Sequence, residues 1–305
     1  MNGFKEVNHR NPCPICGKTD WCSMSSDGAV YCCRRMDTEG GIQKIDKSGI
    51  PYCLYFEEGW NETYSTHPFT KSENVKRAEP AILDQVYQKL LHRFPLTSAH
   101  RQNLIQRGLN NEEIEKRGYG SLGANKRWKK TKDLVEELGE NVCRHVPGFI
   151  KKKGEYGVYW TLSGMPGILI PVRDIQKRII ALKVRLDEST ESGKYRYLSS
   201  KAQGGVGAGT HVHVPLFQGV VSDVLQVTEG ELKADIATVL QESLTISIPG
   251  VSTWRMVFPI LEQFHPKTIS IAFDSDCRSN STVANCLEQF AKEIRRKGYE
   301  LQLVQ

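Results

Sequence analysis

Two short apolar runs in the C-terminal third of this 305-residue chain end in carboxylates: one stops at Glu229, and the other at Asp274 and Asp276. Side chains alternate along an extended segment, so Asp274 and Asp276 face the same way. Three carboxylates in one place repel one another, and a hard divalent cation, usually Mg²⁺, relieves that repulsion while leaving positions open for phosphate oxygens. If the fold brings these residues together, they predict a metal site for phosphate chemistry.

The segment that must position these carboxylates alternates strand and helix patterns. These patterns fall at residues 224–229, 231–241, 244–250, 255–264 and 269–273, and a further helix and strand are expected at 281–297 and 299–304. A β-α-β-α-β order indicates a parallel sheet, whose strands all deliver their C-terminal ends to one edge. Glu229 and Asp274 can therefore meet although 44 residues lie between them. Either run alone would fit a strand that simply ends in a polar loop; the two together favour a metal site.

A second concentration of chemistry lies near the N-terminus, where five of the nine cysteines fall between positions 13 and 33. A Cys-x-x-Cys pair before a glycine forms a tight knuckle, and Asp27-Gly28 predicts a hairpin turn that returns a second strand toward it. Four thiolates in tetrahedral geometry suit Zn²⁺ and leave no open position, so the predicted site is structural. Its expected ligands are Cys13, Cys16, Cys22 and only one of the adjacent Cys32 and Cys33, which point to opposite faces of a strand.

The composition, 39% apolar and 25% charged, is ordinary for a soluble globular protein. There is no run of 18 apolar residues and no signal-peptide core, so we expect a cytoplasmic protein without a membrane segment. The charge is uneven: residues 116–153 carry 11 Lys and Arg against 4 Asp and Glu, a net charge of +7, whereas residues 224–305 carry 8 against 10, a net charge of −2. A basic flank beside an acidic site is the arrangement expected of a protein that brings a polyanion to bound cations.

The middle of the chain is expected to be helical. Helical patterns occupy residues 81–95 and 99–107, and a third short one ends at Gly118. A Thr97-Ser98 cap precedes the second, and an Asn110-Asn111 cap begins the third. A basic cluster with one indole follows, at Lys126, Arg127, Trp128, Lys129, Lys130 and Lys132. Lysine and arginine bind phosphates and aromatic rings stack on bases, so this cluster predicts single-stranded DNA binding; the alternative is an exposed polar loop.

Residues 167–174 and 179–186 predict two strands joined by a tight turn, and residues 193–201 predict a further strand. A glycine-rich segment at 204–209 follows. Alone it is a weak signal for a phosphate-binding loop, and plain flexibility explains it equally well.

The Glu229-Gly230 and Asp274-x-Asp276 signatures resemble the Toprim domain of DnaG-type primases, topoisomerases and some nucleases, over residues 224–305. The glycine that often follows the acidic pair is absent, and Cys277 stands there. A topoisomerase is disfavoured, because nothing in the chain resembles the further domain that carries its nucleophilic tyrosine.

The segments before the Toprim-like region resemble the catalytic core of DnaG-type primases. The arginine of that family's hairpin matches Arg185, and its Lys-Tyr-Leu-Asn-Ser strand matches the segment that contains Tyr197-Leu198-Ser199. Ser199 replaces the family's asparagine. The family's lysine corresponds to Arg196 in strict register or to Lys194 with a two-residue slip.

The cysteine module resembles zinc modules of phage and plasmid primases, in which a single cysteine precedes basic residues. That resemblance favours Cys33, which stands before Arg34 and Arg35, as the fourth ligand, and Cys22 replaces a histidine. The whole chain is thus expected to be an α/β protein with a zinc ribbon, a helical region and a Toprim-type parallel sheet. The expected domains are 1–60 (zinc ribbon), 61–80 (linker), 81–150 (helical and basic), 151–222 (core with a basic hairpin) and 223–305 (Toprim).

The resemblance implies a DNA primase, a nucleotidyltransferase that makes short primers from nucleoside triphosphates on single-stranded DNA, with a replicative helicase as a further candidate partner. Glu229, Asp274 and Asp276 would hold Mg²⁺ or Mn²⁺. Nucleotide or template phosphates would be bound by Arg173, Lys183, Arg185, Lys194, Arg196 and Lys201. The alternatives are a metal-dependent Toprim nuclease and a non-catalytic DNA-binding accessory protein.

Overall fold

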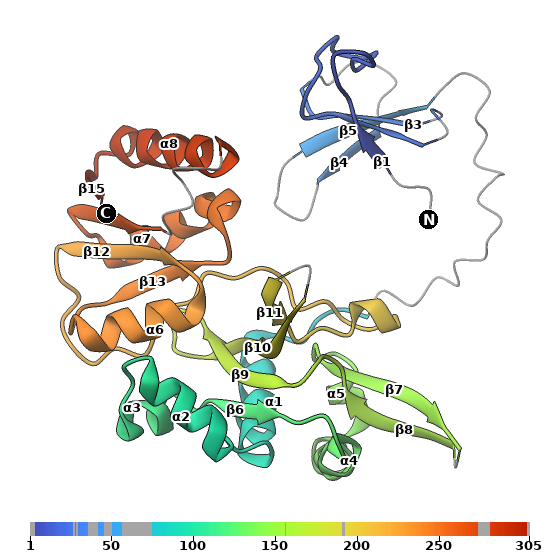
Figure 1. Ribbon diagram of the computed structural model, residues 1–305, viewed down its shortest axis with the longest axis vertical. Helices are drawn as coiled ribbons and strands as arrows, with labels where there is room; N and C mark the ends of the chain where they lie inside the picture. Colours follow the sequence, from blue (N-terminus) through green and yellow to red (C-terminus); the bar gives the residue numbers. More distant parts are fainter. Residues whose placement is uncertain are drawn as a thin grey trace. The chain divides into compact units, whose positions relative to one another are not determined.

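The computed structural model (Figure 1) describes residues 4–26, 28, 30–35, 42–45, 51–56, 75–155, 157–190, 193–273 and 281–303. The chain forms two compact units, residues 1–71 and 72–305. The finer boundaries expected from the sequence, at 60, 80, 150 and 222, remain predictions. Within the described residues, no helix combines the length and apolar character needed to cross a bilayer.

The first unit is a five-stranded antiparallel sheet with strand order β1-β2-β3-β5-β4. The strands are β1 (Phe4–Glu6), β2 (Ser23–Ser25), β3 (Val30–Cys33), β4 (Ile42–Ile45) and β5 (Pro51–Phe56). The predicted turn joins β2 to β3: the Gly28 N–H donates to the Ser25 carbonyl (2.9 Å), while Asp27 lies outside the described residues. Cysteines dominate its small core, together with Val7 and Tyr55.

The second unit opens with the three expected helices, α1 (Pro80–Arg93), α2 (Ser98–Gln106) and α3 (Asn111–Arg117). Both predicted N-caps are present, because the side chain of Thr97 accepts from the His100 N–H (3.3 Å) and that of Asn110 accepts from the Glu113 N–H (2.8 Å). Helix α3 ends at Gly118, whose φ of 70° is the left-handed conformation that glycine favours.

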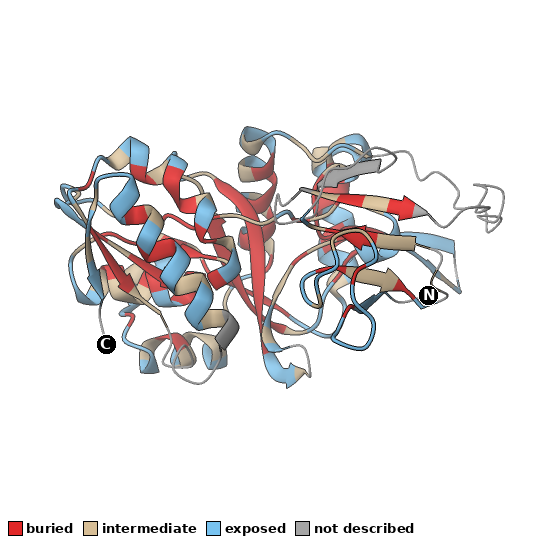
Figure 2. Ribbon diagram, turned by 90° about the horizontal axis from the view of Figure 1, so that it is seen from above, coloured by how far each residue is buried: buried red, intermediate tan, exposed pale blue. Residues whose placement is uncertain are grey.

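The predicted hairpin is confirmed as β9 (Gly167–Arg173) and β10 (Ile179–Thr190), within an antiparallel sheet of order β11-β10-β9-β6 that also contains β11 (Gly193–Tyr197) and β6 (Gly120–Leu122). One face of this sheet buries Leu182, Val184 and other apolar residues against α1. Because side chains alternate, Lys183 and Arg185 share the opposite face. Figure 2 shows the buried residues concentrated on such strands and on the inward faces of helices.

Two features of the middle region were not predicted. The basic cluster opens a helix, α4 (Arg127–Leu138), which is followed by α5 (Glu140–Cys143), so the alternative of a polar loop does not describe residues 127–132. The helix forms because residues 127–138 contain no Gly or Pro and bury Leu134 and Val135 on one face. The hairpin of β7 (Phe149–Gly154) and β8 (Gly157–Leu162) was not predicted, since three successive lysines interrupt any alternation in β7.

The C-terminal part is a four-stranded parallel sheet of order β13-β12-β14-β15, as the β-α-β-α-β pattern predicts. Its elements are β12 (Val224–Glu229), α6 (Glu231–Leu240), β13 (Thr245–Ile248), α7 (Phe258–Phe264), β14 (Thr268–Ala272), α8 (Ser281–Arg296) and β15 (Glu300–Leu303). Helix α6 covers one side of the sheet and α8 the other (Figure 1).

The helix expected at 255–264 is wrong in its first part. Residues Val251–Val257 form a 3₁₀-helix, η3, and only Phe258–Phe264 is α-helical. Pro259 lies in the first turn of α7, where its missing N–H costs no hydrogen bond, whereas an α-helix begun at 255 would place it in the interior.

A buried polar network fixes α6 against the rest of the second unit. The Asp235 carboxylate accepts from Arg117 Nε (3.1 Å), the Tyr119 hydroxyl (2.6 Å) and His213 Nε2 (3.3 Å), and all four side chains are buried. His213 Nδ1 accepts from the Arg173 N–H, so the other ring nitrogen is the donor to Asp235. Burial alone raises the pKa of Asp235, but His213, Arg117 and Tyr119 together lower it below its ordinary value.

Replacing Asp235 should therefore destabilise the fold in a pH-dependent way. Asp235→Asn should lower the free energy of unfolding by about 3 kcal/mol at pH 7, because it removes one of the two carboxylates that pair with the buried Arg117 and the charged acceptor of the whole network. A lowered folded-state pKa gives a stabilisation that is complete above the unfolded pKa of about 4 and is lost as the pH falls through the folded value. The deficit of the variant should thus shrink in acid, which denaturant unfolding at several pH values would measure.

The matched control is Asp133→Asn, since Asp133 is 59% exposed and lies 3.6 Å from Arg93. That change should cost less than about 0.5 kcal/mol. Equal losses for the two variants, or a loss for Asp235→Asn that does not depend on pH, would contradict the role given to the network.

Candidate functional site

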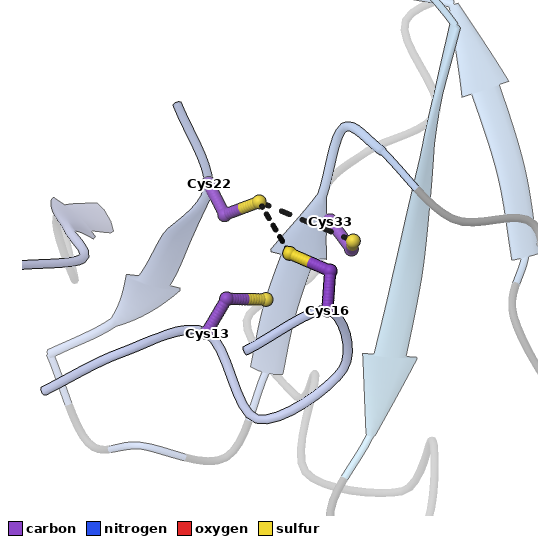
Figure 3. Close-up of side chains that lie close together, drawn as sticks. All are labelled: Cys13, Cys16, Cys22 and Cys33. Atoms are coloured by element: carbon purple, nitrogen blue, oxygen red, sulfur yellow. Dashed lines mark hydrogen bonds between the residues drawn. The ribbon is translucent and has the colours of Figure 1, made fainter. Parts of the chain in front are cut away.

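Four of the predicted zinc ligands converge in the first unit (Figure 3). The sulfur atoms of Cys13, Cys16, Cys22 and Cys33 all lie within 4.8 Å of one another. Cys16 and Cys22 are 3.7 Å apart, and Cys22 and Cys33 are 3.9 Å apart. Sulfurs in a tetrahedral zinc site with bonds of about 2.3 Å lie about 3.8 Å from one another, so the cluster has the size that Zn²⁺ requires.

Strand β3 decides between the two adjacent cysteines. Cys33 points into the cluster, while Cys32 pairs with Ser23 and lines a groove with Phe4 and Tyr52. Cys53 is buried beside Cys33 in the neighbouring strand but is not in the cluster, as expected for a core residue. Burial raises the pKa of Cys22 to about 12. The pKa of Cys16 falls to about 7, because hydrogen bonds from the Lys18 backbone and neighbouring thiols outweigh burial.

The knuckle presents an aromatic and basic surface. Trp21 is 56% exposed and has a φ of 64°, which is rare for a bulky residue. The Arg35 guanidinium lies over its ring at 5.5 Å and pairs with Asp20 at 2.9 Å. Trp21 and Asp20, the neighbours of the cluster residue Cys22, are thus held by stacking and charge.

In the second unit, Glu229 is the last residue of β12, at the edge where the parallel strands end. Thr228 is in register with Ala272 of β14, and its hydroxyl donates to the Ala272 carbonyl at 2.7 Å. The chain that continues from β14 therefore leaves the sheet beside Glu229. Asp274 and Asp276 lie outside the described residues, so the three-carboxylate site remains a prediction that the strand order fits.

Lys183 and Glu231 form a buried ion pair next to this edge. The Lys183 ammonium lies 2.9 and 2.8 Å from the two carboxylate oxygens of Glu231, the first residue of α6. It also lies over the Tyr197 ring, 5.0 Å from the centroid, and the Tyr197 hydroxyl donates to Glu231 (3.4 Å). Burial and the charge of Glu231 raise the pKa of Tyr197.

Arg185 lies two residues along the same face of β10 and, unlike Lys183, pairs with none of the carboxylates that the structure describes. It is 9% exposed, its Nε is buried without a hydrogen-bond partner, and no ion pair joins it to any other residue that the structure describes. A buried guanidinium without an anion is costly, so this position is suited to bind a phosphate.

The other predicted phosphate-binding cations are not gathered around Arg185. Arg173, at the turn end of the hairpin, donates to the carbonyls of Lys177 and Arg117, and burial lowers its pKa. Arg196 is in register with Val184, hence on the opposite face of β10 from Arg185, and donates to Thr190. Lys194 shares that opposite face by alternation along β11, and Lys201 is exposed in a 3₁₀ turn.

The predicted DNA-binding cluster forms one wall of a groove of about 500 Å³ between α4 and the β7–β8 hairpin. The groove is lined by Lys126, Arg127, Trp128, Lys152, Tyr159 and Met165, among others. The rings of Trp128 and Tyr159 are 6.3 Å apart at an angle of 68°, and both are partly exposed. Arg127 donates to the carbonyls of residues 162–164, so it shapes the groove.

The remaining lysines of the cluster have different surroundings. Lys129 lies 5.5 Å from the Trp128 ring centre, Lys130 lies 5.3 Å from that of Phe94, and Lys132 pairs with Glu136. Lys152, Tyr159 and Glu231 were not among the residues predicted from the sequence. The first two require knowledge of the β7–β8 hairpin, whereas the acidic character of Glu231, two residues after Glu229, was a usable signal.

No protein-family model and no curated protein matches this chain by sequence. Solved structures do match. A DNA primase domain from Pseudomonas aeruginosa has a TM-score of 0.50 at 15% identity, over 73% of this chain and 70% of that one. The RNA polymerase domain of Mycobacterium tuberculosis primase DnaG has a TM-score of 0.50 at 16% identity, over 74% and 76%.

An Aquifex aeolicus primase structure that contains zinc-binding and RNA polymerase domains also matches, and the alignment spans 54% of its chain. The two matches with a TM-score of 0.50 are at 15% and 16% identity, so they show similarity of fold alone. The chain therefore shares the fold of DnaG-type primase domains, as the sequence resemblance implied.

Proposed function

We propose that this protein is a primase-type nucleotidyltransferase that extends short oligonucleotides from nucleoside triphosphates on a single-stranded DNA template. The observation that carries the proposal is a buried Arg185 that forms no ion pair with any described residue. It lies two residues along β10 from Lys183, whose ion pair with Glu231 joins this strand to the turn that follows Glu229. The shared primase fold supports it.

In this proposal the carboxylates at the end of the parallel sheet bind the metal ion, and Arg185 on β10 binds the nucleotide. Glu229, Asp274 and Asp276 hold Mg²⁺ or Mn²⁺, which would supply charge stabilisation and activation of the attacking 3′-oxygen. Arg185 binds a phosphate of the incoming nucleotide, because its planar, permanently charged guanidinium suits two phosphate oxygens. The low exposure of Arg185 strengthens that contact by excluding water.

The first test is Asp274→Asn. It should reduce nucleotide incorporation by at least about 100-fold while leaving the fold intact, because it removes one charge from a repulsive cluster and keeps the side-chain volume. Incubation with single-stranded DNA, Mg²⁺ or Mn²⁺ and labelled nucleotides would show the product lengths.

Asp223→Asn is the matched control, since Asp223 precedes β12 at its opposite end and pairs with exposed Lys267. It should leave synthesis unchanged. Shortening of labelled DNA without added nucleotides, lost in Asp274→Asn, would establish a nuclease instead. DNA binding without synthesis or cleavage would contradict the proposal and indicate a non-catalytic accessory protein.

We propose that the template strand lies in the groove between α4 and the β7–β8 hairpin. Exposed Trp128 and Tyr159 offer ring surfaces to bases. Lys126 and Lys152, which line the groove, and Lys129, which lies against the Trp128 ring, offer charge to phosphates. The sequence-independent character of such contacts fits a template that changes as synthesis proceeds.

Lys126→Gln with Lys129→Gln should therefore weaken single-stranded DNA binding equally across sequences. Two lost phosphate contacts should reduce the slope of log affinity against log salt by about 1.4. Fluorescence anisotropy between low and moderate salt measures this slope. The control, Lys267→Gln with Lys292→Gln, removes two exposed lysines that pair with Asp223 and Glu288; an equal change in slope there would contradict the groove.

We propose that the four-cysteine cluster binds one structural Zn²⁺, because its sulfur separations match a closed tetrahedral site. Elemental analysis should find about one equivalent per chain, and Cys13→Ser with Cys16→Ser should abolish it. Cys143→Ser, which changes a buried cysteine of the second unit, is the control. Metal loss should unfold residues 10–40, and unchanged zinc content in the double variant would refute the assignment.

A further inference from the structure

The ion pair between Lys183 and Glu231 is closed to ligands. Its side chains are 9% and 1% exposed, and both carboxylate oxygens already lie within 2.9 Å of the ammonium. The Tyr197 ring covers the ammonium on another side. Arg185, on the same strand face, has none of these contacts among the described residues, so the two neighbouring cations cannot serve the same purpose.

The pair joins the antiparallel sheet to the parallel sheet next to the turn that follows Glu229. Lys183 belongs to the antiparallel strand β10, whereas Glu231 is the first residue of α6, which packs on the parallel sheet. Only Gly230 separates Glu231 from Glu229. A fixed Glu231 side chain therefore fixes the turn between β12 and α6, and with it the direction of the Glu229 carboxylate.

We propose that Lys183 and Glu231 are positioning residues for the divalent-cation site: their buried ion pair holds the strand-to-helix turn that carries Glu229, and Lys183 does not contact nucleotide phosphate. This inference rests on the proposed metal site at Glu229. It assigns phosphate binding on β10 to Arg185 and metal-site geometry to Lys183.

The test measures Mn²⁺ binding directly, by electron paramagnetic resonance titration of the full, zinc-loaded chain, and needs no turnover. Glu231→Gln and Lys183→Met should each raise the Mn²⁺ dissociation constant roughly 10–100-fold, the usual effect of losing a group that orients a ligand. Nucleotide KM at saturating Mn²⁺ should stay within about twofold, because no phosphate contact is removed.

Breaking a buried pair can unfold a protein, so the double variant Lys183→Met with Glu231→Gln is included. It leaves no uncompensated buried charge and should unfold at a temperature closer to the wild type than either single variant. Its Mn²⁺ affinity should nevertheless remain low, which separates positioning from stability.

Thr238→Val is the matched control on the same helix. Thr238 is buried, accepts from the Thr245 N–H (3.0 Å) and lies two turns beyond Glu231, so its loss should lower stability without changing Mn²⁺ affinity. Unchanged Mn²⁺ affinity in the double variant, or a rise in nucleotide KM alone for Lys183→Met, overturns the inference. A wild-type chain that binds no Mn²⁺ overturns the proposed metal site and this inference together.

Discussion

The attachment of helix α6 by buried charges is the constraint on which the proposed metal site depends. Two ion pairs anchor it: Glu231 with Lys183 at its first turn, and Asp235 with Arg117 one turn later. Taking four charges out of water is expensive, and apolar contacts of similar size would hold the helix as well. What charge pairs add is specificity, because a helix rotated or shifted by one residue would break both pairs and leave Lys183, Glu231 and Asp235 without these partners, while Arg117 would keep Glu113.

That specificity matters because α6 begins directly after the strand that ends in Glu229. The apolar contacts of α6, such as Leu232 against Ile168 and Ile170, would tolerate sliding. The ligands of a metal site must converge within a few tenths of an ångström, so the proposed site would allow little displacement of α6. The polar contacts thus supply a positional accuracy that the surrounding core does not.

The parallel sheet was predictable from the sequence because its strands are short apolar runs with clear helical periodicity between them. The caps at Thr97 and Asn110 were predictable because they depend on local hydrogen bonds alone. A resemblance was needed to choose Cys33 over Cys32 as the fourth predicted ligand, and in the structure Cys33 lies in the four-cysteine cluster while Cys32 does not. Features that depend on tertiary structure could not be predicted. The β7–β8 hairpin lacks alternation of apolar and polar residues, and the sheet faces on which Arg185 and Arg196 lie depend on the register between strands.

Gly230 shows how one motif can carry two kinds of information. Its φ of 82° and ψ of 132° lie outside the left-handed helical region that asparagine can adopt, while no atom lies within 4 Å of the place a Cβ would take. Backbone geometry therefore selects glycine here, and neither crowding nor a ligand's approach is needed to explain it. In a Glu-Gly signature, the glycine reports only that a parallel strand turns sharply into a helix. Only the carboxylate carries information about the chemistry. A search that gives the glutamate and the glycine equal weight will also find proteins that have the same turn but do not catalyse the reaction.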